Sequence, residues 1–197
     1  MSIKIISGCL KGSVLAVPES ARPTLLRSRQ SLFDILVSTG GSSSDPQRFF
    51  ENKVVLDCFA GSGALGIEAL SRGAQFAYFV DISQKSIDVI YKNIKKLRLE
   101  YQCKIIKTDI FKIKKLKNER KSDVIFVDPP YGKVSIAKTI KSLCEKGWVK
   151  ENTLIVIEED ISNFEDLSSL MNISVERKLG HSLFRIATIK QADGIWR

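Results

Sequence analysis

Histidine is nearly absent from the sequence, and the few cysteines lie far apart along the chain. The 197 residues include one histidine, His181, and four cysteines, none of them in a C-x-x-C motif. A single histidine excludes most histidine-based metal sites and Ser-His-Asp catalysis. Cysteines this far apart are typical of reduced thiols rather than of a disulfide framework, so we expect neither disulfides nor a metal cofactor.

The sequence also lacks a long hydrophobic run. No apolar segment approaches the roughly 18–20 residues that cross a bilayer. The first residues, MSIKIISGCLKG, are too polar for a signal peptide. We therefore expect a cytoplasmic protein without a membrane partner. The length suits one domain, or one domain with a small appendage, and we expect a monomer.

Acidic residues are outnumbered by basic ones. With 31 basic and 22 acidic residues, the chain has a formal net charge of +9. Such an excess favours a polyanionic partner, above all nucleic acid, although a lysine-rich solvated surface has the same composition.

The pattern of the chain divides it into a short first region, a long second region and a tail. Residues 1–45 contain two short apolar segments, 3–6 and 14–17, which predict a β-hairpin, followed by a helix that begins after Thr24. The Gly- and Ser-rich segment 38–46 marks the boundary, and residues 191–197 form the tail.

Residues 46–190 alternate between strand and helix patterns. Helices are predicted at 64–72, 83–97 and 135–145, and strands at 54–56, 76–80, 104–107, 124–127, 153–157, 173–179 and 182–189. This alternation predicts an α/β fold, with a mostly parallel sheet covered on both sides and a terminal antiparallel strand pair.

One motif, Asp128-Pro129-Pro130-Tyr131, follows the apolar strand 124–127. Proline cannot donate to a sheet ladder, so the strand has to end at Asp128. Ligands bind at this carboxyl edge in open α/β sheets. A carboxylate, free carbonyls on a stiff backbone and a flat ring suit the amino group of a planar base. A strand-ending turn without function is the alternative.

A glycine-rich loop follows the strand 54–56. Gly61, Gly63 and Gly66 spell G-x-G-x-x-G, the dinucleotide fingerprint, so a nicotinamide enzyme is one interpretation. Asp57 favours another, because a carboxylate just before the glycine turn repels a pyrophosphate and attracts a cation. S-adenosylmethionine carries a sulfonium and an ammonium group, and glycines let the backbone approach it closely.

Two further acids follow later strands. Asp81 is placed to accept hydrogen bonds from ribose hydroxyls. Asp109 is placed to meet the adenine amino group, although it is equally suited to capping the next segment. The predicted cofactor site also includes their apolar neighbours Ile82 and Ile110, and Phe59 in the glycine-rich loop.

A bound methyl donor assigns the D-P-P-Y motif a specific role. Hydrogen bonds from an exocyclic amine to the Asp128 carboxylate and the Pro129 carbonyl favour a pyramidal nitrogen whose lone pair points at the methyl group. Tyr131 stacks on the base, and Pro130 belongs to the stiff backbone of the catalytic site. Positioning and electrostatics carry the catalysis, because the methylated nitrogen is strongly acidic. Adenine, cytosine and guanine all offer such an amine.

Basic residues gather around the start of the first helix. Arg22, Arg27 and Arg29 cluster where Thr24 caps the helix, an unfavourable place for positive charge because the helix dipole is positive there. The cluster indicates an anionic ligand, and we assign these four residues to binding the RNA backbone. A solvated helix is the alternative.

The combined motifs resemble a known family. D-P-P-Y after D-x-F-x-G-S-G resembles the S-adenosylmethionine-dependent amino-methyltransferases, and segments 5–12, 22–33, 57–74 and 126–131 resemble the bacterial RsmD family over about residues 3–189. The resemblance implies a Rossmann-like class I methyltransferase with a seven-stranded sheet. It further implies methylation of the N2 amine of a guanine, the guanine-966 type of site in 16S rRNA, within the 30S subunit or its assembly intermediate.

A few positions depart from the family pattern. The family usually has glycine where this chain has Ser7, and often a basic residue where it has Ser13. It usually has acids at the positions of Gln30 and Ser83, and the loop 40–46 is longer here than usual.

Three other functions are compatible with parts of the sequence. They are a DNA or RNA adenine-N6 or cytosine-N4 amino-methyltransferase, an NAD-dependent Rossmann enzyme and a non-catalytic RNA-binding module.

Overall fold

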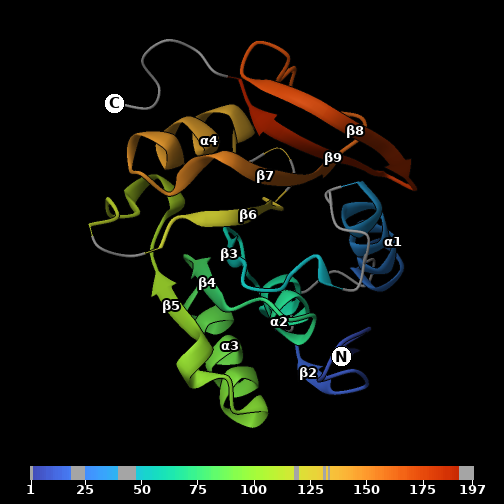
Figure 1. Ribbon diagram of the computed structural model, residues 1–197, viewed down its shortest axis with the longest axis vertical. Coiled ribbons are helices and arrows are strands. Elements are labelled where there is room, and N and C mark those ends of the chain that lie inside the picture. Colours follow the sequence, from blue (N-terminus) through green and yellow to red (C-terminus); the bar gives the residue numbers. More distant parts are fainter. Residues whose placement is uncertain are drawn as a thin grey trace.

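The computed structural model describes residues 2–18, 25–39, 48–117, 120–130, 132 and 134–190, and a seven-stranded sheet forms its centre (Figure 1). The strand order is β5-β4-β3-β6-β7-β9-β8. The first five of these are mutually parallel, and β9 runs antiparallel to both of its neighbours. Their bounds are β3 (Val54–Asp57), β4 (Phe76–Asp81), β5 (Cys103–Lys107), β6 (Ser122–Val127), β7 (Val149–Asp160), β8 (Met171–Leu179) and β9 (Ser182–Ile189).

This order confirms the predicted fold class and locates the crevice. From β3 the chain moves outward through β4 to β5, then returns to add β6 and β7 on the other side of β3. The connections that leave β3 and β6 therefore diverge, and ligands bind at such a switch point, outside the carboxyl ends of the strands.

Helices cover the sheet because its strands are apolar on both faces. The helices are α2 (Ala64–Ser71), α3 (Gln84–Leu97) and α4 (Ile136–Glu145), with short 3-10 turns η2 (Glu100–Gln102) and η3 (Ile110–Lys112). Successive strand residues face opposite layers. Val55 joins the core that includes α2 and α3, whereas Val54 and Leu56 join the core that includes α4. No helix of the described ranges is long and apolar enough to cross a membrane.

The N-terminal region packs on the same core as the sheet. The predicted hairpin and helix are present as β1 (Ser2–Lys4), β2 (Val14–Ala16) and α1 (Leu25–Thr39). Ile3 and Leu15 of the hairpin, and Phe33 of α1, belong to the hydrophobic cluster that contains Val55 and Phe126. The described part of this region is therefore packed against the sheet layer, and a domain boundary near residue 45 stays a prediction.

Polar contacts with α2 hold the turn of the hairpin. The buried carboxylate of Glu68 accepts hydrogen bonds from the backbone N–H groups of Ile6 (2.8 Å) and Ser7 (3.0 Å). Cys9 N–H donates to the Ser71 carbonyl at 2.8 Å. The chain approaches α2 so closely at Gly8 that an added Cβ atom would lie 1.7 Å from the Ser71 carbonyl oxygen. The hairpin is thereby docked directly beside the helix that follows the glycine-rich loop.

The main difference from the predicted elements is the length of β7, which was expected only at 153–157. Its first residues are polar and exposed around Glu151 and Asn152, so they carry no apolar alternation. The pairing with β6 shifts register there, from Ser122–Val149 to Val124–Leu154. At its other end β7 continues to Asp160, three residues beyond the predicted end of the strand.

Candidate functional site

The predicted site residues follow neighbouring strands at one edge of the sheet. Asp57 ends β3 and pairs with Phe126 of β6, two residues before Asp128. Asp81 ends β4 and pairs with Lys107, the last residue of β5. Because these strands are parallel, their carboxyl ends share an edge, and the structure brings the glycine-rich loop and the D-P-P motif to the same crevice.

The start of the glycine-rich loop is hydrogen-bonded to both neighbours of β3 in the sheet, β6 and β4. Cys58 N–H donates to the Phe126 carbonyl of β6, and Ala60 N–H donates to the Val80 carbonyl of β4, both at 3.0 Å. Gly61 (φ 56°) and Gly63 (φ 78°) then adopt left-handed backbone conformations. Such conformations are costly for other residues. The loop thus exposes backbone at the crevice and leads directly into α2.

Asp57 lies beneath this loop and is almost completely buried. Only 2% of its surface is exposed, and its Oδ2 accepts a hydrogen bond from Gly66 N–H at 3.2 Å. Burial raises the pKa of Asp57 to about 7, with a smaller contribution from the negative charge of Asp81, while the Gly66 contact acts in the opposite direction. A buried carboxylate with a raised pKa is poised to gain stabilisation from a cationic group. This placement fits the predicted role toward the ammonium of a cofactor.

Asp81 organises the opposite side of the loop. Its Oδ2 accepts from Gly61 N–H and its Oδ1 accepts from Ser83 N–H, each at 2.8 Å. Each carboxylate oxygen has a further lone pair, so these contacts orient Asp81 and leave it able to accept from ribose hydroxyls. Ser83, which departs from the family pattern, caps α3 by accepting from Ser86 N–H. Ile82 is 67% exposed beside these groups.

Asp109 has the capping role that was its alternative interpretation. Its Oδ1 accepts from Phe111 N–H at 2.9 Å and begins the turn η3. The side chain is half-buried, and a cap uses one oxygen of the carboxylate, so a contact with adenine stays a prediction. Ile110 is buried in the core that includes α4, and Phe59 is half-buried against the same core.

Sequence reasoning missed Asn93, which ties the glycine-rich loop to the N-terminal hairpin. The Asn93 amide donates to the carbonyls of Ser62 and Ala16, and its oxygen accepts from Ala16 N–H, all at 2.9 Å. Asn93 is 1% exposed. A signal was present, because Asn93 lies on the apolar face of its helix, between Ile90 and Leu97.

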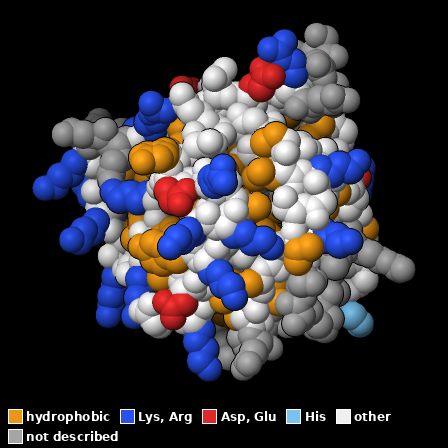
Figure 2. All heavy atoms as spheres, turned by 90° about the horizontal axis from the view of Figure 1, so that it is seen from below, with side chains coloured by type: hydrophobic (Ala, Val, Ile, Leu, Met, Phe, Trp, Pro, Cys, Tyr) orange, Lys and Arg blue, Asp and Glu red, His pale blue; other side chains and the backbone are white. Residues whose placement is uncertain are grey.

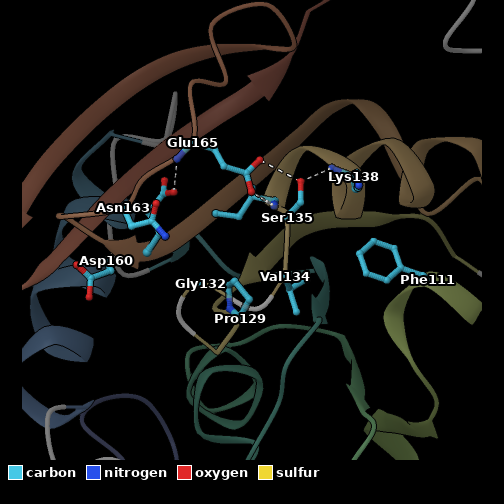
Figure 3. Close-up of a pocket in the computed structure, with 11 residues that line it drawn as sticks. Phe111, Pro129, Gly132, Val134, Ser135, Lys138, Asp160, Asn163 and Glu165 are labelled. Carbon is cyan, nitrogen blue, oxygen red and sulfur yellow. Dashed lines mark hydrogen bonds between the residues drawn. The ribbon is translucent and has the colours of Figure 1, made fainter.

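A cavity of about 460 Å³ opens beside the D-P-P motif (Figure 3). Asp128 is half-buried, Pro129 is buried and lines the cavity, and Pro130 is exposed. Tyr131 lies outside the described residues, so its predicted stacking is a proposal. The other residues around the cavity come from η3, the loop after the D-P-P motif, the start of α4, the end of β7 and the segment that follows it. They are Phe111, Gly132, Val134, Ser135, Ile136, Lys138, Glu159, Asp160, Asn163 and Glu165. None of these was predicted from the sequence.

The structure bears differently on the four residues that were predicted to bind RNA. Arg22 and Thr24 lie outside the described residues, and Arg27 belongs to α1. The prediction that Arg29 contacts RNA at the surface is wrong, because its side chain is 2% exposed and donates a hydrogen bond to the Lys4 carbonyl. Burial also lowers the pKa of its guanidinium. Arg29 therefore packs α1 against the hairpin.

Positive charge is nevertheless abundant on the surface. Figure 2 views the molecule from below Figure 1, and Lys and Arg side chains are spread over much of this face. The outer side of α3 and its C-terminal cap contribute the exposed residues Lys85, Lys92, Lys95, Lys96 and Arg98. Such a surface attracts a polyanion over a long range. Among the described residues no group of three or more His, Cys, Asp or Glu side chains could hold a metal ion.

Comparisons with known proteins agree with this architecture. The family model described as "Conserved hypothetical protein 95" matches residues 3–188. A Buchnera aphidicola protein named "Ribosomal RNA small subunit methyltransferase D" is 39% identical, over 80% of this chain and 78% of its own. The protein of the same name from Escherichia coli K12 is 32% identical, over 82% and 76% of the two chains.

A solved structure extends the likeness to three dimensions. The Escherichia coli "Putative methyltransferase yhhF" superimposes with a TM-score of 0.80 at 28% identity, over 98% of this chain and 100% of that one. The matched segment includes both the glycine-rich loop and the D-P-P-Y motif. The chain therefore belongs to the family described as "Conserved hypothetical protein 95", the RsmD family.

Proposed function

We propose that this protein is an S-adenosylmethionine-dependent methyltransferase that modifies the N2 amine of a guanine in the 16S rRNA of the small ribosomal subunit. The observation that carries the proposal is the adjacency of β3 and β6: Asp57 ends β3, and Asp128 directly follows β6. It supports a cation-binding carboxylate beside an amine-binding one. The names of the relatives support ribosomal RNA as the substrate. The resemblance of the sequence motifs to the RsmD family supports guanine N2 at the guanine-966 type of site.

The residues of the crevice fit S-adenosylmethionine. Asp57 would neutralise its ammonium group, and the backbone at Gly61 and Gly63 would lie against it without side chains in the way. Asp81 would hold the ribose, and Asp109 would lie toward the adenine. The bound cofactor supplies an electrophilic methyl group on a sulfonium.

The D-P-P motif would position the nucleophile. An exocyclic amine of a nucleobase is weakly nucleophilic, because its lone pair is delocalised into the ring. The Asp128 carboxylate and the Pro129 carbonyl would accept its two N–H groups, which favours a pyramidal nitrogen with a directed lone pair. The new N–C bond would form as the methyl–sulfur bond of the sulfonium breaks, so that S-adenosylhomocysteine leaves as a neutral thioether. The nitrogen would then lose a proton to solvent, since the methylated ammonium is strongly acidic. Orientation and electrostatics would supply the rate enhancement.

The RNA would be held by charge on the N-terminal side of the molecule. Arg22, Thr24 and Arg27 remain candidates for contacts with the RNA backbone, and the basic face of α3 would add long-range attraction. The proposed substrate is the 30S subunit or an assembly intermediate, acted on by a monomer in the cytoplasm.

Mass-spectrometric mapping of rRNA nucleosides, with and without the gene, tests the proposal. Small subunits from cells lacking the gene should accept a labelled methyl group from S-adenosylmethionine and yield N2-methylguanosine at one position. The Asp128→Ala variant should bind S-adenosylhomocysteine normally but transfer no methyl group. Labelled DNA adenine with unlabelled rRNA would contradict the assignment, and calorimetric binding of NAD without S-adenosylhomocysteine would contradict the cofactor.

A further inference from the structure

The wall of the cavity opposite Pro129 is formed by the segment that follows β7. Asp160 ends β7, and Asn163 and Glu165 follow it along the rim (Figure 3). Asn163 lies close to the loop that follows the D-P-P motif, since a Cβ atom added at Gly132 would be 3.6 Å from its Nδ2. A base whose amine lies at Asp128 and Pro129 would therefore present its ring edge to this segment.

Two carboxylates of the wall are structural. Glu159 is 4% exposed, pairs with Arg185 of β9 at 2.8 Å and accepts from Glu165 N–H at 2.9 Å. Glu165 accepts from the first N–H groups of α4, with 2.7 Å to Ile136 and 3.1 Å to Ala137. Arg185 also donates to the Glu165 carbonyl at 2.8 Å. The segment is therefore anchored at both ends to β9 and α4, as a specificity wall needs to be.

The third carboxylate, Asp160, is oriented by the wall itself. Its Oδ1 accepts from Ser162 N–H at 2.8 Å, and its own carbonyl accepts from Asn163 N–H at 3.1 Å. Asp160 lines the cavity, and its carboxylate can act only as an acceptor when ionised.

An acceptor beside the amine site distinguishes the three bases that carry an exocyclic amine. The C2 amine of guanine is flanked by two ring nitrogens, of which N1 is an N–H donor and N3 an acceptor. In adenine and cytosine the one ring nitrogen next to the amine is an acceptor, so only guanine can offer an N–H on this edge. A carboxylate there gains a charge-assisted hydrogen bond from guanine and faces a repelling lone pair in the other two.

We propose that Asp160 accepts the N1–H of the target guanine and makes the enzyme specific for that base, with Asn163 beside it facing the O6 side. This inference rests on the proposed function and answers what the D-P-P-Y motif leaves open, which is the choice among the three bases. Glu159, Glu165 and Arg185 act as positioning residues for this wall.

The test replaces the target guanine by 2-aminopurine, which keeps the C2 amine but has an unprotonated N1 and no O6; the change that Asp160→Asn makes in the preference isolates the N1 contact. Small subunits are reconstituted with ligated 16S rRNA that carries either base at the mapped target, and single-turnover methyl transfer is measured. The wild-type enzyme should prefer guanine by roughly 10- to 100-fold, the value of one charged hydrogen bond. Asp160→Asn should reduce this preference to a few-fold, because the amide can donate to an unprotonated N1.

Asp166→Asn is the matched control. Asp166 is exposed, does not line the cavity, and accepts from Ser168 N–H at 2.9 Å in the same way that Asp160 accepts from Ser162. This variant should keep the wild-type preference. Thermal unfolding and S-adenosylhomocysteine binding verify the fold, and Asp160→Ser replaces Asp160→Asn if the latter does not fold.

Three outcomes would overturn the inference. Equal rates on both bases with wild-type enzyme would remove the role of N1–H while leaving the proposed function intact. An unchanged preference in the Asp160 variant would assign the discrimination to another group. No transfer to guanine-containing subunits would overturn the proposed function and the inference with it.

Discussion

Cofactor binding should be coupled to release of a proton from Asp57. In the unliganded protein the pKa of this buried carboxyl is raised to about 7, mainly by burial. An ammonium group placed beside it stabilises the carboxylate and lowers the pKa. The unliganded protein therefore holds the proton more tightly than the complex does, so affinity should rise with pH through this range.

The size of the effect follows from the pKa of about 7. At pH 6 about nine-tenths of the unliganded molecules carry the proton, and at pH 7 about half do. Binding should release about 0.9 proton at pH 6 and about 0.5 at pH 7, and the affinity should be about five-fold higher at pH 7 than at pH 6.

Isothermal titration of S-adenosylhomocysteine, in buffers of different ionisation enthalpy, measures the released protons directly. Asp57→Asn keeps an acceptor for Gly66 N–H but does not titrate, so it should bind more weakly at pH 7 and release no proton. Asp88→Asn is the control, because Asp88 is exposed on α3. Wild-type binding without proton release, or equal release by the Asp57 variant, would refute the reasoning.

Three further predictions concern the contacts that build the site. Gly8→Ala should destabilise the protein by more than about 3 kcal/mol, because its Cβ would meet the Ser71 carbonyl at 1.7 Å. Gly12→Ala has a similar φ of 85° but open space around it, so chemical denaturation should show a loss of only about 1 kcal/mol; equal losses would contradict the clash. Asn93→Ala should release the glycine-rich loop and weaken S-adenosylhomocysteine binding about ten-fold in calorimetry, beyond its effect on Tm, and unchanged affinity would exclude a positioning role. Arg185→Met should cost about 3–5 kcal/mol of unfolding free energy, because it leaves a buried carboxylate unpaired, and a neutral result in urea titration would show that the pair contributes nothing.

Local pattern was sufficient to predict most of the elements and the position of the glycine-rich loop. Asp57 and Asp81 were expected at strand ends, and they lie there because a parallel sheet collects the carboxyl ends of its strands at one edge. A helix was expected to begin at residue 83, and Ser83 caps it. The alternative interpretation of Asp109 as a cap was also confirmed.

Arg29 shows where charge misled the interpretation. It was assigned to RNA from its charge and its place near a helix start, yet it follows Leu25 by four residues and precedes Phe33 by four. Residues at this spacing share a helix face, so the apolar periodicity of α1 already placed Arg29 toward the core. Its burial in the structure agrees with the periodicity rather than with the charge.

The sequence by itself determined the fold class, the order of the elements and the two motifs, because periodicity, helix caps and proline act over a few neighbouring residues. Only the tertiary structure decided which groups line the cavity beside the D-P-P motif. Pro129 follows β6 and Asp160 ends β7, while Arg185 of β9 pairs with Glu159 of β7, and these groups are brought near one another because β6, β7 and β9 are neighbours in the sheet. Contacts of this kind depend on packing between segments far apart in the chain, and no local pattern encodes them.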